Sequence, residues 1–105
     1  IQFMKEAPNV MSNRWLTTLT IDPSIIGKNR DEIIIALEKN NIEARPVWKP
    51  MHMQPLYKKY NYVSNNTIDI SRDLFKNGLC LPSGSNLSKK NQDKVIDIVI
   101  STIGS

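Results

Sequence analysis

Cysteine and histidine are almost absent from this sequence, and their scarcity excludes several kinds of chemistry. The 105 residues include one cysteine, Cys80, and one histidine, His52. One cysteine cannot form an internal disulfide, which fits a reducing cytoplasm, and one residue of each type is too few for a zinc site. Because Cys80 lies between Leu79 and Leu81, we expect a buried structural cysteine and not a nucleophile activated by His52.

Long apolar runs and familiar catalytic motifs are also missing. No apolar run approaches the ~18 residues that a membrane-spanning helix needs, and the apolar stretch at residues 95–100 is broken by Asp97. No Gly-rich dinucleotide motif, phosphate-binding loop, paired CxxC, HExxH or GxSxG occurs. The chain alone is therefore not expected to perform hydrolysis, phosphoryl transfer or redox chemistry. We assign it no metal site.

The remaining composition is that of one cytoplasmic globular domain. Apolar residues make up 40% and charged residues 23% of the chain, which is usual for a folded domain of this length. The net charge is +4, but the basic residues are scattered and form no stripe. We therefore expect neither nucleic acid nor membrane as a partner, while a few cations could face an anionic small molecule.

Apolar periodicity and turn residues predict an α+β fold with the order β-α-β-loop-α-β-α. We expect about three strands in one small sheet, with helices packed on one face in two layers. The expected strands lie at residues 14–22, 44–48 and 79–81. The expected helices begin after the capping residues Asn29, Asn66 and Ser88, and the second of them ends at Gly78 in the usual left-handed position.

Two segments are expected to lie outside these elements. Residues 1–13 are interpreted as an irregular lead-in from a missing large domain, and residues 14–105 as the small domain itself. Asp22, Pro23 and Ser24 are typical of a turn. A long connection at residues 49–66, with one helical turn near residues 56–60, is rich in methionine, tyrosine, proline and asparagine, and connections of this length are usually functional or disordered.

The segment at residues 45–55, with the sequence RPVWKPMHMQP, is the strongest candidate for a binding site. Its three prolines restrict the backbone. Between them stand Arg45, Trp48, Lys49 and His52, side chains that hold phosphates and carboxylates or stack on flat rings. Two interpretations remain open at this level: a ligand-binding segment, or a proline-stiffened connection whose tryptophan and methionines only pack.

Three strings of residues resemble the C-terminal part of the DegT/DnrJ/EryC1/StrS aminotransferases. They are SNRWL at residues 12–16, NIEARPVWKPMH at residues 41–52, and LCLPSG at residues 79–84 followed by a capped helix. The resemblance covers roughly residues 12–105. The RPVWKPMH string is similar to members that act on UDP-linked 4-keto-6-deoxy sugars in bacillosamine and exopolysaccharide pathways.

The resemblance implies a fold-type I enzyme that depends on pyridoxal phosphate and transfers an amino group from glutamate to a nucleotide-linked keto sugar. In such enzymes the catalytic lysine and the cofactor site lie in a large N-terminal domain, and the enzyme is a homodimer. No lysine of this chain matches the lysine motif of the family, so we assign the chain no catalytic residue and no cofactor-binding residue. The isolated chain is therefore expected to be inactive and to expose an apolar face where the large domain would dock.

The resemblance also gives the small domain a part in substrate binding. It implies that Arg45 and Lys49 contact anionic groups, that Trp48 stacks or packs, and that His52 forms a hydrogen bond with sugar or phosphate. Trp15 is expected in the core. The alternative function is a free-standing basic α+β module that binds an anionic ligand or a protein partner.

Overall fold

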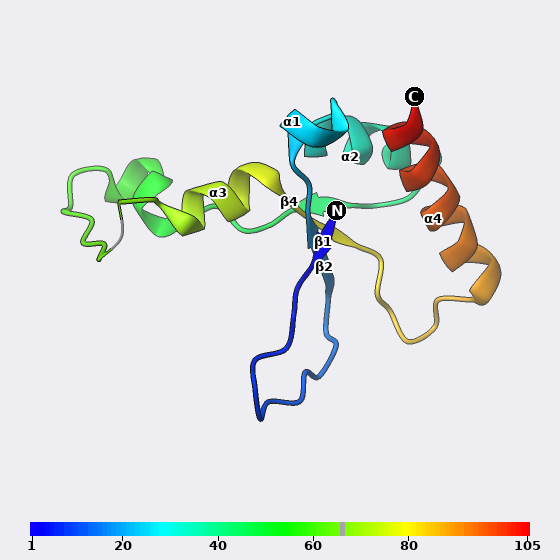
Figure 1. The fold of residues 1–105 in the computed structure, drawn as a ribbon, viewed down its shortest axis with the longest axis horizontal. Coiled ribbons are helices and arrows are strands. Elements are labelled where there is room, and N and C mark those ends of the chain that lie inside the picture. Colours follow the sequence, from blue (N-terminus) through cyan, green and yellow to red (C-terminus); the bar gives the residue numbers. More distant parts are fainter. Residues whose placement is uncertain (66) are drawn as a thin grey trace.

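One antiparallel sheet runs through the centre of the molecule (Figure 1). The computed structural model describes residues 1–65 and 67–105, and in this part of the chain the sheet has four strands in the order β1-β2-β4-β3. The strands are β1 (Gln2–Phe3), β2 (Thr17–Thr20), β3 (Arg45–Pro46) and β4 (Gly78–Leu81). Since β4 pairs on both sides, it forms the centre of the sheet, with Leu79 opposite Leu19 of β2 and Pro46 of β3.

The helices begin where local capping chemistry allows. They are α1 (Pro23–Ile26), α2 (Arg30–Glu38), α3 (Ile70–Asn77) and α4 (Lys89–Gly104), with 3₁₀ helices η1 (Met51–Met53) and η2 (Pro55–Tyr57). The Asn29 side chain accepts from the backbone N–H groups of Asp31 and Glu32, and the Glu32 carboxylate accepts from the backbone N–H of Asn29 at 2.8 Å. This capping box and the Ser88 cap of α4 confirm two of the three predicted helix starts.

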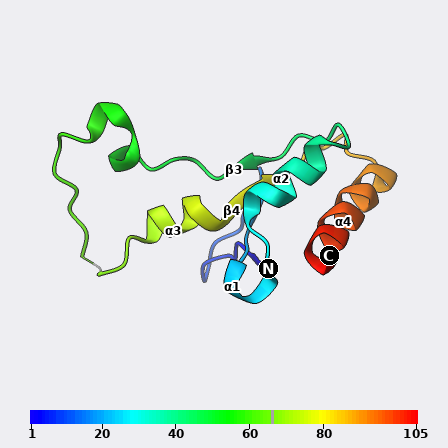
Figure 2. The same cartoon turned by 90° about the horizontal axis from the view of Figure 1, so that it is seen from above.

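The core lies between one face of the sheet and the helices α2 and α4, which pack against each other (Figure 2). Leu79 of β4 and Ile33 and Leu37 of α2 are fully buried. Val95 and Val99, one turn apart on α4, complete the cluster together with Leu19. The predicted α+β class is confirmed. Within the described residues, no helix is long and apolar enough to cross a membrane.

The predicted strand count and several boundaries are wrong. The structure has four strands because residues 2–3, taken as irregular, pair with β2, with Phe3 opposite Leu19. A two-residue edge strand carries no periodicity that a sequence could reveal. The predicted turn after Asp22 is the short helix α1, which Asp22 caps by accepting from the backbone N–H of Ser24.

The helix before the central strand ends at Asn77 as predicted, but its start and the conformation of the glycine after it differ from the prediction. It begins at Ile70, capped by Asp69, whose carboxylate accepts from the backbone N–H of Arg72 at 3.0 Å; the predicted cap, Asn66, lies outside the described residues. Gly78 is not left-handed but extended, with φ −99° and ψ 142°. A Cβ at Gly78 would come within 2.4 Å of the Leu74 carbonyl oxygen and 2.7 Å of Cγ2 of Val47. The position therefore needs glycine for close approach and not for a turn.

Residues 49–65 and 67–77, here called the arm, project away from the rest of the molecule (Figures 1 and 2). The radius of gyration is 15.6 Å, compared with about 13 Å for a compact domain of this length. None of the described residues of the arm is buried. Its exposed apolar side chains are Met51, Leu56, Tyr60, Tyr62, Val63, Ile68, Ile70 and Leu74. An apolar surface of this kind usually marks an interface.

Candidate functional site

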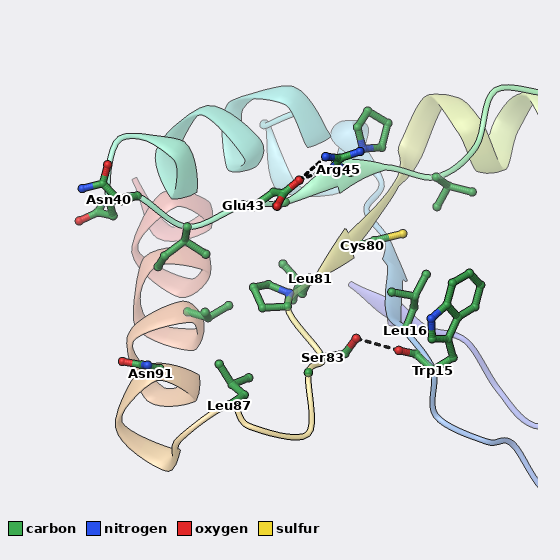
Figure 3. A pocket seen from close by; sticks show the side chains of 18 of the residues that line it. Trp15, Leu16, Asn40, Glu43, Arg45, Cys80, Leu81, Ser83, Leu87 and Asn91 are labelled. Carbon is green, nitrogen blue, oxygen red and sulfur yellow. Dashed lines mark hydrogen bonds and ion pairs between the residues drawn. The ribbon is translucent and has the colours of Figure 1, made fainter.

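A hollow of about 1050 Å³ opens beside the C-terminal end of β4. Its walls come from residues 40–49, from residues 80–84, from the first half of α4, and from Trp15 and Leu16 just before β2. Figure 3 shows Leu87 and Asn91 on the α4 side and Trp15 on the opposite side, with the Glu43–Arg45 pair above them. Segments far apart in the sequence therefore meet here.

Three of the four predicted site residues line this hollow: Arg45, Trp48 and Lys49. The Arg45 guanidinium forms an ion pair with the Glu43 carboxylate, and 78% and 72% of the two side chains are exposed. An ion pair this exposed contributes little to stability because water screens it. Arg45 can therefore exchange Glu43 for an anionic ligand at small cost. Lys49 is exposed.

His52 does not line the hollow. Its Nε2 lies 2.7 Å from Oδ2 of Asp69, and its ring stacks on Tyr62 with 3.8 Å between ring centroids. Only 14% of the His52 side chain is exposed. The structure thus places the fourth predicted residue on the arm, in contact with the carboxylate of Asp69 that caps the start of α3.

Asp69 joins η1 to α3 through several hydrogen bonds. Burial raises the pKa of its carboxyl, but the bonds from the Arg72 N–H, the Ser71 hydroxyl and His52 outweigh burial and lower this pKa to about 2. The Ser71 hydroxyl donates to Oδ1 at 2.9 Å. These contacts need the ionised carboxylate, which accepts bonds but cannot donate.

The low pKa of Asp69 predicts an acid-dependent contribution to stability. A carboxyl whose pKa is lower in the folded state stabilises above its unfolded pKa, and this contribution is lost as the pH falls from about 4 toward 2. Urea unfolding at several pH values should therefore show the wild-type chain more stable than Asp69→Asn at pH 6, with the difference shrinking between pH 4 and pH 2. A difference that stays constant across this range would contradict the assignment.

Trp15 was expected in the core, and this prediction is wrong. The strand β2 begins only at Thr17. Trp15 therefore lies before the strand and does not follow the alternation that places Leu19 in the core. Trp15 is 69% exposed and Trp48 is 63% exposed, and their ring centroids lie 5.8 Å apart. Sequence reasoning missed the exposed position of Trp15 because its spacing from Leu19 and Ile21 is typical of one continuous strand. In the structure, β2 does not extend back to Trp15.

Cys80 is buried, as predicted. It lies on β4 opposite Thr18 and Arg45, and burial raises the pKa of its thiol. A thiol with a raised pKa is a poor nucleophile at neutral pH. Cys80 therefore forms part of the wall of the hollow and is not its reactive group.

The described residues do not fit a pyridoxal phosphate site or a metal site. No group of three or more His, Cys, Asp or Glu side chains that could hold a metal ion occurs among them. No lysine of this chain matches the lysine motif that the family resemblance implies for the cofactor. What the site offers is two exposed rings and several cations, which suit binding and orientation of a ligand.

Solved structures share this fold. The aminotransferase TlmJ from Streptoalloteichus hindustanus matches with a TM-score of 0.76 and 18% identity, over 98% of this chain and 26% of TlmJ. A DegT DnrJ EryC1 StrS aminotransferase from Brucella abortus matches with a TM-score of 0.70 and 27% identity, over 86% of this chain and 22% of that one. The fold is thus one that occurs as part of larger aminotransferases.

Sequence comparison gives the family. The profile of the DegT/DnrJ/EryC1/StrS aminotransferase family matches residues 1–100, and the chain belongs to this family. It is 46% identical over 101 residues to EpsN of Bacillus subtilis (strain 168), a candidate pyridoxal phosphate-dependent aminotransferase. It is also 30% identical over 83 residues to the GDP-perosamine synthase of Vibrio cholerae. These two matches include 95% and 79% of this chain, but only 25% and 22% of the length of the two relatives.

Proposed function

We propose that this chain is the non-catalytic C-terminal small domain of a pyridoxal phosphate-dependent aminotransferase. The full-length enzyme would transfer an amino group from glutamate to a nucleotide-linked keto sugar for polysaccharide biosynthesis. Family membership and similarity to EpsN support the reaction class, and the name of the GDP-perosamine synthase supports a nucleotide-linked sugar. The observation that carries the proposal is the meeting of Arg45, Trp48 and Lys49 at one hollow.

In this proposal the small domain binds and orients the substrate. Arg45 and Lys49 contact its anionic groups, and charge-assisted bonds of this kind are about twice as strong as neutral ones. Trp48 offers an exposed ring to a flat or apolar part of the ligand. The cofactor would supply the electron sink for the amino transfer, and the residues that hold it belong to the remainder of the enzyme.

His52 would hydrogen-bond the sugar through its second ring nitrogen. When the Asp69 carboxylate accepts the proton of Nε2 at 2.7 Å, a neutral imidazole carries its lone pair on Nδ1. The His52 ring is then fixed by Asp69 on its edge and by Tyr62 on its face. Held in this way, His52 would accept a hydrogen bond from a sugar hydroxyl.

The partner of this domain would be the large N-terminal domain of the same enzyme, and the enzyme would be a cytoplasmic homodimer. The apolar side chains of the arm have no cover within the described residues. The lead-in segment likewise exposes Phe3, Met4 and Met11. A free-standing module that binds an anionic ligand or a protein partner is the weaker alternative, because the chain spans only 25% and 22% of the two relatives.

Cofactor binding separates the full-length enzyme from the isolated domain. The full-length protein mixed with pyridoxal phosphate should develop a visible absorbance band distinct from that of the free cofactor, and should convert a nucleotide-linked keto sugar in the presence of glutamate. The 105-residue chain should do neither, because none of its lysines matches the lysine motif of the family. A stable cofactor band on the 105-residue chain, lost on replacing one of its lysines, would contradict the proposal.

A further inference from the structure

The two tryptophans of the chain, Trp15 and Trp48, form an exposed pair at the edge of the hollow. They arrive from segments 33 positions apart, one before β2 and the other after β3. Their ring planes are tilted by 33° with 5.8 Å between centroids, so that they touch each other and leave their outer faces open. Tryptophan carries the largest ring surface of any side chain, and exposing two such rings is unfavourable unless a ligand or partner covers them.

The backbone around Trp15 is held in place by side chains whose hydrogen bonds converge on it. The Asn13 side chain accepts from the Trp15 N–H at 3.1 Å, and the Ser12 hydroxyl accepts from the Arg14 N–H at 3.1 Å. From the far side, the Ser83 hydroxyl donates to the Trp15 carbonyl at 2.8 Å (Figure 3). Arg14 has φ +54°, a left-handed conformation that is unfavourable for arginine. The left-handed conformation of Arg14 and three hydrogen bonds thus fix the backbone that positions the exposed Trp15 ring.

The charged residues that line the hollow indicate which kind of ligand would bind against the two rings. Its lining includes three cations, Arg45, Lys49 and Lys94, and of the described residues that line it only Glu43 is acidic. Exposed aromatic rings next to cations bind nucleotides, because bases stack on the rings while the cations attract the phosphates. A purely apolar protein segment would match the rings but would leave these cations without partners.

We infer that Trp15 and Trp48 form a ring-stacking subsite for the base of a nucleoside diphosphate, with Arg45 and Lys49 facing its phosphates. This inference rests on the proposed function and deepens it, since it assigns one end of the nucleotide-linked substrate to named residues. Trp15 becomes a residue that determines affinity for the nucleotide. The reacting sugar would then lie on the far side of the phosphates, away from the tryptophan pair.

A matched pair of variants in the full-length enzyme tests this subsite. Trp15→Leu keeps an apolar side chain but removes the aromatic ring, whereas Trp15→Phe keeps a ring. Inhibition by free UDP and by free GDP is measured for each enzyme, together with the KM for the nucleotide sugar. For the nucleotide that inhibits the wild type, Trp15→Leu should raise the inhibition constant and the KM roughly 5- to 30-fold, as loss of base stacking does, while Trp15→Phe should stay within a few-fold of the wild type. The glutamate half-reaction should change less than twofold in both.

The outcomes separate the subsite from the function on which it rests. If neither nucleotide inhibits the wild-type enzyme, the proposed nucleotide-linked substrate is wrong and the subsite is wrong with it. If a nucleotide inhibits the wild type but Trp15→Leu leaves its inhibition constant unchanged, only the subsite is wrong. If Trp15→Leu and Trp15→Phe weaken nucleotide and glutamate reactions equally, Trp15 packs against the rest of the enzyme and a protein partner covers the pair.

Discussion

Leu79→Ala is expected to destabilise the 105-residue chain by about 3 kcal/mol, within the range for buried leucines. Leu79 is 0% exposed and lies on the central strand, between Leu19 and Pro46 of the neighbouring strands. Shortening it removes apolar contacts with the core and leaves a cavity that the sheet cannot close. Because small domains are stable by only about 5–15 kcal/mol, the urea midpoint should fall markedly.

Leu56→Ala is the matched control for this experiment. Leu56 lies on η2 and is 69% exposed, so that the same chemical change should alter the free energy of unfolding by less than about 0.5 kcal/mol. Equilibrium urea unfolding followed by circular dichroism measures both variants. Equal losses for the two leucines would mean that the core does not lie between the sheet and α2.

Arg45→Ala in the full-length enzyme should raise the KM for the nucleotide sugar and lower kcat/KM roughly 10- to 100-fold. This factor corresponds to about 1.5–3 kcal/mol, the usual contribution of a hydrogen bond to a charged group. The glutamate half-reaction should change much less, because glutamate does not reach the nucleotide end. Steady-state kinetics of the two half-reactions measure this difference.

Two control variants make the Arg45 result specific. Glu43→Gln removes the ion-pair partner of Arg45 and should leave the KM unchanged or lower it, since Arg45 no longer has to leave a carboxylate. Lys28→Ala removes a cation that pairs with Glu32 outside the hollow and should have no effect. If Arg45→Ala lowered both half-reactions equally, or changed only the melting temperature, Arg45 would have a structural role and the segment would be a stiffened connection.

The sequence predicted those parts of the fold that depend on local chemistry. The capping box at Asn29, the Ser88 cap and the buried environment of Cys80 each follow from a few adjacent residues, and all three are confirmed. The edge strand Gln2–Phe3 could not be predicted, because its pairing with β2 is a contact between distant segments. The need for glycine at position 78 was missed for a similar reason, because the close approach of Val47, the residue that follows β3, comes from a distant segment.

Sequence reasoning could predict only those residues of the candidate site that lie close together in the sequence. Arg45, Trp48 and Lys49 lie within five consecutive residues, and the sequence placed them together. Trp15 joins them through the pairing of β2 with β4, and Asp69 reaches His52 across 17 residues. Neither contact leaves a pattern in the sequence, so that both become visible only in three dimensions.

The helix α3 leads directly into β4, so that the arm is joined to the centre of the sheet without a loop. Asn77 ends the helix and Gly78 begins the strand, so that no loop is present to absorb a displacement of the arm. The backbone N–H of Val47 bonds to the Gly78 carbonyl at 3.1 Å, and Arg45 lies opposite Cys80 in the same register. A partner surface that held the outer end of the arm would therefore act on the first residue of the central strand without an intervening loop. The position of Arg45 would then depend on the orientation of α3 as well as on its own strand.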